Sequence, residues 1–443
     1  MFGYSMTRLV RTHMHKLDRP LREKILHLYQ PFKRIPCFMH SLFEEWLKRK
    51  RQLSVVVEFK DGCYHAGYTT LNKVIAPCKR SKVKQHFSRI SCCSMDVTPN
   101  RLEEVLLSCH HIHKIYLNRE VKALLDVAVP SIKGKNVIGN NSKLTGKGTT
   151  VAIIDTGIYP HKDLSGRITH FVDFVNHRTD PYDDNGHGTH CAGDVAGNGS
   201  ASSGKYMGPA PEAQLVGVKV LDKMGAGTLE TIIQGVDWCI EYNEKHTDHP
   251  IDIISMSLGS KAHPYDSENN DPMVKIVEEA WNAGIVVCAA AGNDGPEAKT
   301  IASPGISNQI ITVGALDDRN NKEREESDVA SFSSRGPTIY GEIKPDILAP
   351  GVNIVSLRSP HSLLDKTQKS KRVEENYFAL SGTSMATPIC AGVAALIKEA
   401  KPTATPEEIK ELLKEGADIW TDRDPNVYGA GYLNAENAVP EKE

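Results

Sequence analysis

Ser384 stands in the stretch Gly382-Thr383-Ser384-Met385-Ala386-Thr387-Pro388, at the start of an apolar helix. Pro388 suits the first turn of that helix, because the backbone N–H groups there have no partner within the helix. Ser384 is a helix cap in one interpretation, since a serine oxygen satisfies one of these donors. It is a nucleophile in the other, because the unpaired N–H groups and the helix dipole favour developing negative charge. This stretch alone does not decide between the two interpretations.

Two residues elsewhere could activate such a serine. Asp155 ends the apolar run Val151–Asp155, and taken alone it is typical of a turn cap. His187 lies between two glycines, which leave room for other groups to reach its ring. A hydrolytic serine needs an imidazole to take its proton, and the imidazole needs a carboxylate that holds its tautomer. Asp155, His187 and Ser384 therefore predict an acid, a base and a nucleophile.

Asn293 could supply the remaining requirement, which is a donor to the oxyanion. It follows an apolar run directly and stands in the glycine-flanked turn Gly292-Asn293-Asp294-Gly295. An isolated asparagine here would be an ordinary turn residue. Together with the three other residues, its side-chain N–H₂ group is a candidate oxyanion donor.

Short continuous apolar runs recur along the chain and are typical of strands buried on both faces of a parallel sheet. They are Val151–Asp155, Leu215–Val220, Ile251–Met256, Ile285–Ala289, Ile310–Val313 and Asp346–Ala349. Helical periodicity between them is clearest from Leu229 to Ile240 and from Met273 to Ala283. We predict an α/β domain with a doubly wound, mostly parallel sheet and helices on both faces, with polar residues gathered at the carboxyl ends of the strands.

The N-terminal part has a different pattern. Strands are predicted at Ser54–Phe59, Ile90–Val97 and His113–Asn118, with a helix that begins near Thr98. We therefore divide the chain into an extension over 1–50 to which no chemistry is assigned, an α+β module over 51–125, a linker over 126–148 and the large domain over 149–443.

Composition excludes several classes of protein. The 443 residues are 40% hydrophobic, which suits a globular protein, and no apolar run is long enough for a membrane-spanning helix or a signal peptide. We expect a cytoplasmic protein with no membrane partner, and its ten cysteines show no paired metal spacing. Residues 1–123 carry a net charge of +13 and the remainder −15. Because the basic part lacks a nucleic-acid motif, we expect these parts to attract each other and expect no nucleic-acid partner.

Four segments resemble the Asp, His, Asn and Ser motifs of the subtilisin-like serine peptidases (subtilases), in particular the intracellular bacterial type, and they follow one another in the same order as in that family. They are Val151–Gly157, His187–Gly193, Ala291–Asn293 and Gly382–Pro388. The resemblance covers about two-thirds of the chain and implies a serine endopeptidase that acts on protein or peptide substrates. It implies that Asp155 orients, His187 acts as general base and acid, Ser384 attacks and Asn293 binds the oxyanion.

The resemblance also implies how a substrate is held. Two segments would bind the peptide as an added strand, and a third would complete an apolar specificity pocket with small walls. These segments are Gly225, Ala226 and Gly227; Ser257, Leu258 and Gly259; and Ala290, Ala291 and Gly292. We therefore expect broad cleavage after large or apolar side chains.

Two positions depart from the commonest family pattern. Cys191 resembles the branch with a free thiol beneath the site, so we expect mercurials to inactivate the enzyme, although the residue is also a small buried hydrophobe. The Gly-Ser-rich segment Gly197–Lys205 replaces a calcium loop, and Asp163 alone is a weak candidate ligand. No cofactor is required for the chemistry, and we assign no metal site; a structural calcium ion stays open.

The α+β module resembles the family's inhibitory propeptide. This implies a ferredoxin-like βαββαβ order, a zymogen, and cleavage of the chain by itself between Leu124 and Thr145. Its own N-terminal region would then be an intramolecular inhibitor of the peptidase.

Other functions remain alternatives. A metal-dependent hydrolase would use Asp155, His187 and His190, but no acidic general base stands beside them. A lipase or esterase would need a GxSxG elbow, which is missing. A catalytically silent peptide-binding protein would keep the fold without the chemistry. For the peptidase, His187 must be neutral, so activity should fall as the pH drops through roughly 6 to 7.

Overall fold

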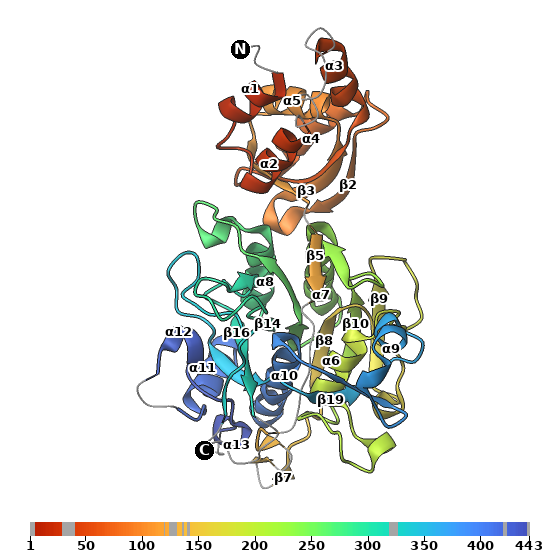
Figure 1. Cartoon of the computed structure of the whole chain (residues 1–443), viewed down its shortest axis with the longest axis vertical. Helices are drawn as coiled ribbons and strands as arrows, with labels where there is room; N and C mark the ends of the chain where they lie inside the picture. The colour runs from red at the N-terminus through yellow and green to blue at the C-terminus, as the bar shows by residue number, and fades with distance from the viewer. Residues whose placement is uncertain are drawn as a thin grey trace. The chain divides into compact units, whose positions relative to one another are not determined.

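The computed structural model describes residues 5–28, 40–118, 120–123, 131–134, 137–139, 142–318, 327–419 and 423–440. It divides into two compact units, an N-terminal unit over Met1–Arg119 and a C-terminal unit over Glu120–Glu443 (Figure 1). Among the described residues, no helix is both long enough and apolar enough to cross a membrane.

The N-terminal unit is a four-stranded antiparallel sheet with helices. Its sheet has the order β2-β3-β1-β4, and every neighbouring pair is antiparallel. The elements from β1 onward follow the order βαββαβ, which confirms the predicted α+β module. They are β1 (Leu53–Phe59), α4 (Tyr64–Ile75), β2 (Lys82–Phe87), β3 (Cys92–Val97), α5 (Pro99–Ser108) and β4 (Ile112–Leu117), and they follow α1 (Ser5–Thr12), α2 (Arg19–His27) and α3 (His40–Lys50).

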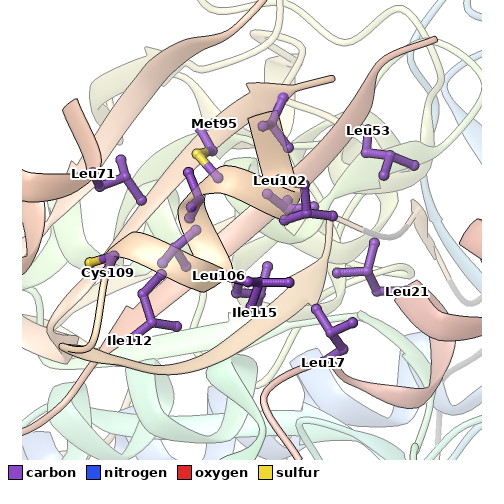
Figure 2. Packing of buried hydrophobic residues seen from close by; sticks show 14 of the residues in the cluster. Leu17, Leu21, Leu53, Leu71, Met95, Leu102, Leu106, Cys109, Ile112 and Ile115 are labelled. Atoms are coloured by element: carbon purple, nitrogen blue, oxygen red, sulfur yellow. The ribbon is translucent and has the colours of Figure 1, made fainter. Parts of the chain in front are cut away.

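Local sequence explains where these helices begin. Thr98 caps α5 by accepting a hydrogen bond from the backbone N–H of Arg101, and Pro99 occupies the first helical position. Asp18 caps α2 in the same way through the N–H of Leu21. One hydrophobic core joins the sheet and its helices (Figure 2).

The C-terminal unit is built on an eight-stranded, mostly parallel sheet, as predicted. Its order is β17-β16-β14-β12-β8-β10-β9, and β18 pairs with β16. The strands are β8 (Thr150–Asp155), β9 (Ile168–Asp173), β10 (Gln214–Lys219), β12 (Ile253–Met256), β14 (Val286–Ala290), β16 (Ile311–Asp317), β17 (Asp328–Val329) and β18 (Ile347–Pro350). All six predicted apolar runs fall on strands of this sheet, and their burial explains why most of their residues are apolar.

Helices cover both faces of this sheet. The long helix α10 (Thr383–Ala400) packs against α6 (His187–Ala196), while α7 (Leu229–Lys245) packs against α8 (Pro272–Asn282) (Figure 1). Shorter helices complete the unit. They are α9 (Leu363–Thr367), α11 (Pro406–Glu415), α12 (Pro425–Tyr428) and α13 (Ala435–Ala438).

Three small sheets lie outside the main one. The first has the order β11-β5-β13-β15, and its members are β5 (Glu120–Ala123), β11 (Ala226–Thr228), β13 (Leu258–Lys261) and β15 (Ala302–Ser303). The second joins β19 (Ile354–Leu357), β21 (Tyr377–Leu380) and β20 (Arg372–Val373). The third is the pair β6 (Ile138–Gly139) and β7 (Ser142–Lys143).

A buried charge cluster ties the end of the main sheet to α11. Asp346 accepts hydrogen bonds from Lys344 Nζ at 2.6 Å and from the backbone N–H of Thr312 at 2.7 Å, and Lys410 Nζ lies 3.1 Å from its other oxygen. Burial raises the pKa of Asp346, but the two lysine charges outweigh it, so the net direction is below the usual value. Asp346 therefore stays ionised in the fold.

We predict that Asp346→Ala lowers the free energy of unfolding by about 3–5 kcal/mol, because it leaves the buried Lys344 ammonium without its carboxylate. Thermal unfolding, followed in a background that carries Ser384→Ala to prevent self-digestion, measures this loss. Glu411→Ala is the control: it removes an exposed ion pair with Lys414 and should cost less than about 0.5 kcal/mol. Equal losses in the two variants would contradict the assignment.

Candidate active site

The predicted acid and base lie together at the core of the C-terminal unit. Asp155 is the last residue of β8 and His187 is the first residue of α6. His187 Nδ1 lies 2.8 Å from Asp155 Oδ1 and 2.9 Å from Oδ2, and both side chains are fully buried. A carboxylate in this position fixes the proton on Nδ1 and leaves Nε2 to accept another.

Close packing at this junction depends on glycine. A Cβ atom at Gly188 would collide with the backbone oxygen of Gly157 and would approach Asp155 Cβ to 3.1 Å. Gly186, the N-cap of α6, has a φ of 108°, which a side chain would strain. The glycines on either side of His187 therefore allow the helix to begin directly against the end of β8.

Asp183 holds this junction in place, and the sequence analysis did not identify it. It is buried, and its carboxylate accepts hydrogen bonds from Thr156 Oγ1, Thr189 Oγ1 and the backbone N–H of Gly186, at 2.7–3.0 Å. These contacts connect the residue after Asp155 with the first turn of α6. An aspartate four residues before a helix start is the kind of signal that could have identified it.

Burial and charge act on His187 in opposite directions. Burial lowers the pKa of His187, but the negative charge of Asp155 and their hydrogen bond outweigh it, so the pKa lies well above its usual value. Burial raises the pKa of Cys191 to about 12, so this thiol is protonated at neutral pH. The imidazole therefore keeps its proton to a higher pH than an ordinary histidine does.

Ser384 lies in the first turn of α10 and is fully buried. Its Oγ donates to the carbonyl of Ser257 at 3.2 Å, while its own carbonyl accepts from Ser257 Oγ at 2.5 Å. Cys191 Sγ lies 3.5 Å from the same carbonyl of Ser384 and 3.8 Å from His187 Nδ1. Cys191 thus contacts both the predicted nucleophile and the predicted base.

Asn293 is placed beside the helix that carries Ser384. Its Oδ1 accepts hydrogen bonds from the backbone N–H and the Oγ1 of Thr383, at 3.0 and 3.1 Å. Because both donors use the carbonyl oxygen, the amide is oriented with its N–H₂ group on the other side. The N-cap of α10 is Gly382, so the asparagine lies next to the N-terminus of this helix.

Residues of two predicted substrate-binding segments pair with an extended segment of the chain itself, strand β5. Strand β5 pairs antiparallel with β11 on one side, with Gly227 opposite Val121 and Ala226 opposite Lys122. It pairs with β13 on the other side, with Gly259 opposite Lys122. Two of the three predicted segments thus hold an extended peptide as an added strand.

The third predicted segment is connected to β13 by a short strand, β15 (Ala302–Ser303), which was not predicted from the sequence. Ala290 ends β14, and the carbonyl of Ala291 accepts the N–H of Ala302 at 2.8 Å. Ala302 belongs to β15, which pairs with β13 through Lys261. The two-residue length of β15 gave no periodic signal.

The residues considered as metal ligands have other partners in the structure. Asp163 is buried, and its carboxylate accepts from Tyr377 OH at 2.7 Å and from the backbone N–H of Ala201 at 2.7 Å. His190 contacts Asp194 Oδ2 at 2.9 Å and the carbonyl of Phe378 at 3.1 Å, so both its ring nitrogens are directed away from Asp155.

One group among the described residues could still hold a cation. Ligand atoms of Asp155, His187 and Cys191 all lie within 4.8 Å of one another, and their oxygen, nitrogen and sulfur donors suit a thiophilic ion such as zinc. An ion there would compete with the hydrogen bond between Asp155 and His187.

Comparisons with known proteins identify the family. The model of the subtilase family matches residues 146–431. The chain is 62% identical over 440 residues to serine protease AprX of Bacillus subtilis strain 168. This alignment covers 99% of this chain and 100% of the relative. It is 36% identical over 300 residues to a thermostable alkaline protease of Halalkalibacterium halodurans, in an alignment that covers 68% of this chain and 70% of the relative.

A solved structure shares the fold. The crystal structure of fervidolysin from Fervidobacterium pennivorans aligns with a TM-score of 0.67 over 88% of this chain and 61% of that chain, at 21% identity. With the family model and the two relatives, these findings show that this chain is a serine protease and belongs to the subtilase family.

Proposed function

We propose that this chain is an endopeptidase that hydrolyses peptide bonds of proteins through Asp155, His187 and Ser384, and that it is made as a zymogen that cleaves its own N-terminal part. The observation that carries the proposal is strand β5, an extended segment held by main-chain pairing in the groove predicted to bind substrate. The buried contact between His187 and Asp155 supports the catalytic roles.

The first step begins when the Ser384 hydroxyl turns from the carbonyl of Ser257 to Nε2 of His187. The imidazole takes the proton as the oxygen attacks the scissile carbonyl, and Asp155 stabilises the resulting imidazolium through Nδ1. The tetrahedral intermediate then expels the amine, which receives the proton from His187. Water repeats the sequence on the acyl-enzyme and releases the second product.

Asn293 stabilises the charge on the intermediate. Its carbonyl oxygen is engaged by Thr383, which supports an amide N–H₂ group directed to the oxyanion. The N-terminus of α10 adds to this effect, because its backbone N–H groups favour negative charge there.

Main-chain pairing with β11 and β13 explains a broad specificity. Such hydrogen bonds do not depend on side chains, so only the pocket beside Ala290–Gly292 selects residues. Small residues line that segment, which favours large or apolar side chains next to the cleaved bond.

The register of β5 also indicates which bond is cut. Ala123 is opposite Leu258, so the next residue of a bound peptide would face Ser257, whose carbonyl accepts the Ser384 hydroxyl. Residues 124–130 lie outside the described part of the chain. We propose that the peptidase cuts between Leu124 and Leu125, within the interval predicted from the sequence, and that the N-terminal part inhibits it until then. A cytoplasmic location stays a prediction.

We expect the wild-type chain to digest casein and to appear by mass as a fragment that begins at Leu125, whereas Ser384→Ala keeps its full mass and digests nothing. The reason is that both reactions use the same nucleophile. Thr367→Ala, which removes an exposed hydroxyl from α9, serves as the control and should retain both reactions. Casein digestion by Ser384→Ala would refute the peptidase mechanism, and a cut elsewhere would refute the proposed bond alone.

The rate of peptide hydrolysis should rise with pH and reach half its maximum above pH 6.5, because the base must be neutral and Asp155 raises its pKa. The midpoint should therefore lie above that of an unperturbed histidine, whose pKa is about 6.5. Asp155→Asn removes the charge but not the burial, so its midpoint should move to lower pH while kcat falls about 10⁴-fold. A midpoint at the same pH in both enzymes would contradict this assignment.

Mercuric chloride should inactivate the wild-type enzyme, because a metal on Cys191 Sγ would press on His187 and Ser384. Cys191→Ala should remain active under the same treatment. Cys239→Ala, which removes a buried thiol from α7, should stay as sensitive as the wild type. Full wild-type activity with Cys191 shown to be mercurated would overturn the prediction.

A further inference from the structure

The described parts of the first fifty residues, 5–28 and 40–50, contribute to the core of the N-terminal unit. Leu9 of α1, Leu21 and Ile25 of α2, and Leu47 of α3 are buried in the same cluster as the sheet strands. Figure 2 shows Leu17 and Leu21 against Leu53, Leu102 and Ile115. The sequence alone assigned no role to this extension, but its apolar side chains complete the core of the module.

The extension also joins the sheet through its backbone. Leu17 forms a parallel bridge with Ile115 of β4, and the N–H of Ile115 donates to the carbonyl of Lys16 at 2.8 Å. The N–H of Asp18 returns a bond to the carbonyl of Ile115 at 3.0 Å. Residues 16–18 therefore cover the outer edge of β4.

Two side chains fix the extension at separate points. Asp18 Oδ1 accepts the N–H of Leu21 at 2.9 Å and that of Leu117 at 3.1 Å, so the cap of α2 is also bonded to β4. Lys48 Nζ of α3 lies 2.7 Å from Glu103 Oε2 of α5, and both side chains are largely buried. A segment that merely preceded the module would have no such contacts.

These contacts have an energetic consequence. A module of about seventy residues has a small core and is marginally stable alone. Burial of several more leucine and isoleucine side chains adds stabilisation of the same order as the whole stability of a small domain. The extension and the module should therefore unfold together.

We infer that residues 5–28 and 40–50 control how long the N-terminal unit restrains the peptidase. Their contacts make the N-terminal unit fold cooperatively, so that it persists after its connection to the peptidase is cut. This inference rests on the proposed function, in which the N-terminal part inhibits the peptidase until cleavage, and it adds that the severed part continues to inhibit afterwards. A severed inhibitor is destroyed mainly from its unfolded state, so its lifetime follows its stability.

Hydrogen exchange in full-length chains that carry Ser384→Ala tests the folding step without any peptidase activity. Leu21→Ala opens a cavity beside β4 and should speed exchange at the most protected amides of β1, β3 and β4 at least about 30-fold. Leu26→Ala, on the same helix but with a side chain that is 43% exposed, is the matched control and should leave exchange nearly unchanged. Unchanged exchange in Leu21→Ala would overturn the inference.

The same two substitutions in the active chain test the regulatory step. Leu21→Ala should shorten the delay between cleavage of the chain and full hydrolysis of a small peptide by several-fold, whereas Leu26→Ala should keep the wild-type delay. Faster exchange with an unchanged delay would show that the extension stabilises the unit but does not regulate the peptidase. If the proposed function itself failed, no hydrolysis would appear in any variant, while the exchange result would stand.

Discussion

The buried hydrogen bond between Asp155 and His187 is the contact on which the rest of the C-terminal unit depends. It joins residues 32 positions apart at a place where water cannot replace either partner. A carboxylate without its imidazole at this depth would be strongly destabilising, so the fold must bring the end of β8 and the start of α6 together. Gly188 allows the approach and Asp183 holds it, which makes the local backbone part of the same constraint.

The order of strands explains how other groups reach this point. Strands β14, β12 and β8 are neighbours in the parallel sheet, so their carboxyl ends lie along one edge. Asp155 ends β8, Ser257 directly follows β12 and Asn293 lies shortly after β14. Helix α10 then begins against this edge, where Ser257 accepts from and donates to Ser384. Residues far apart in sequence meet because the sheet places their strand ends side by side.

The sequence predicted these strands because each is buried on both faces and therefore mostly apolar. It did not predict β9, whose residues Ile168–Asp173 are mostly half-buried or exposed and include Thr169 and His170, so no continuous run marks it. Asp183 was missed for a related reason: its role depends on donors from a helix and a strand that meet only in the fold. The role of the extension was not predicted, because its apolar residues indicate an amphipathic helix but do not show which surface that helix covers.

In the proposed zymogen, strand β5 is the reason why the stability of the N-terminal unit would matter for the peptidase. Four residues paired through the main chain would bind weakly as a free peptide, but a covalent connection gives them a high effective concentration at the groove. Cutting the connection removes that advantage, and any remaining inhibition then requires a fragment that stays folded and presents the strand in an extended form. A marginal module would lose this capacity soon after cleavage, whereas a module whose core is completed by its extension would keep it. In the proposed zymogen, the burial of Leu9, Leu21 and Leu47 would thus separate the time of cleavage from the time of full activity.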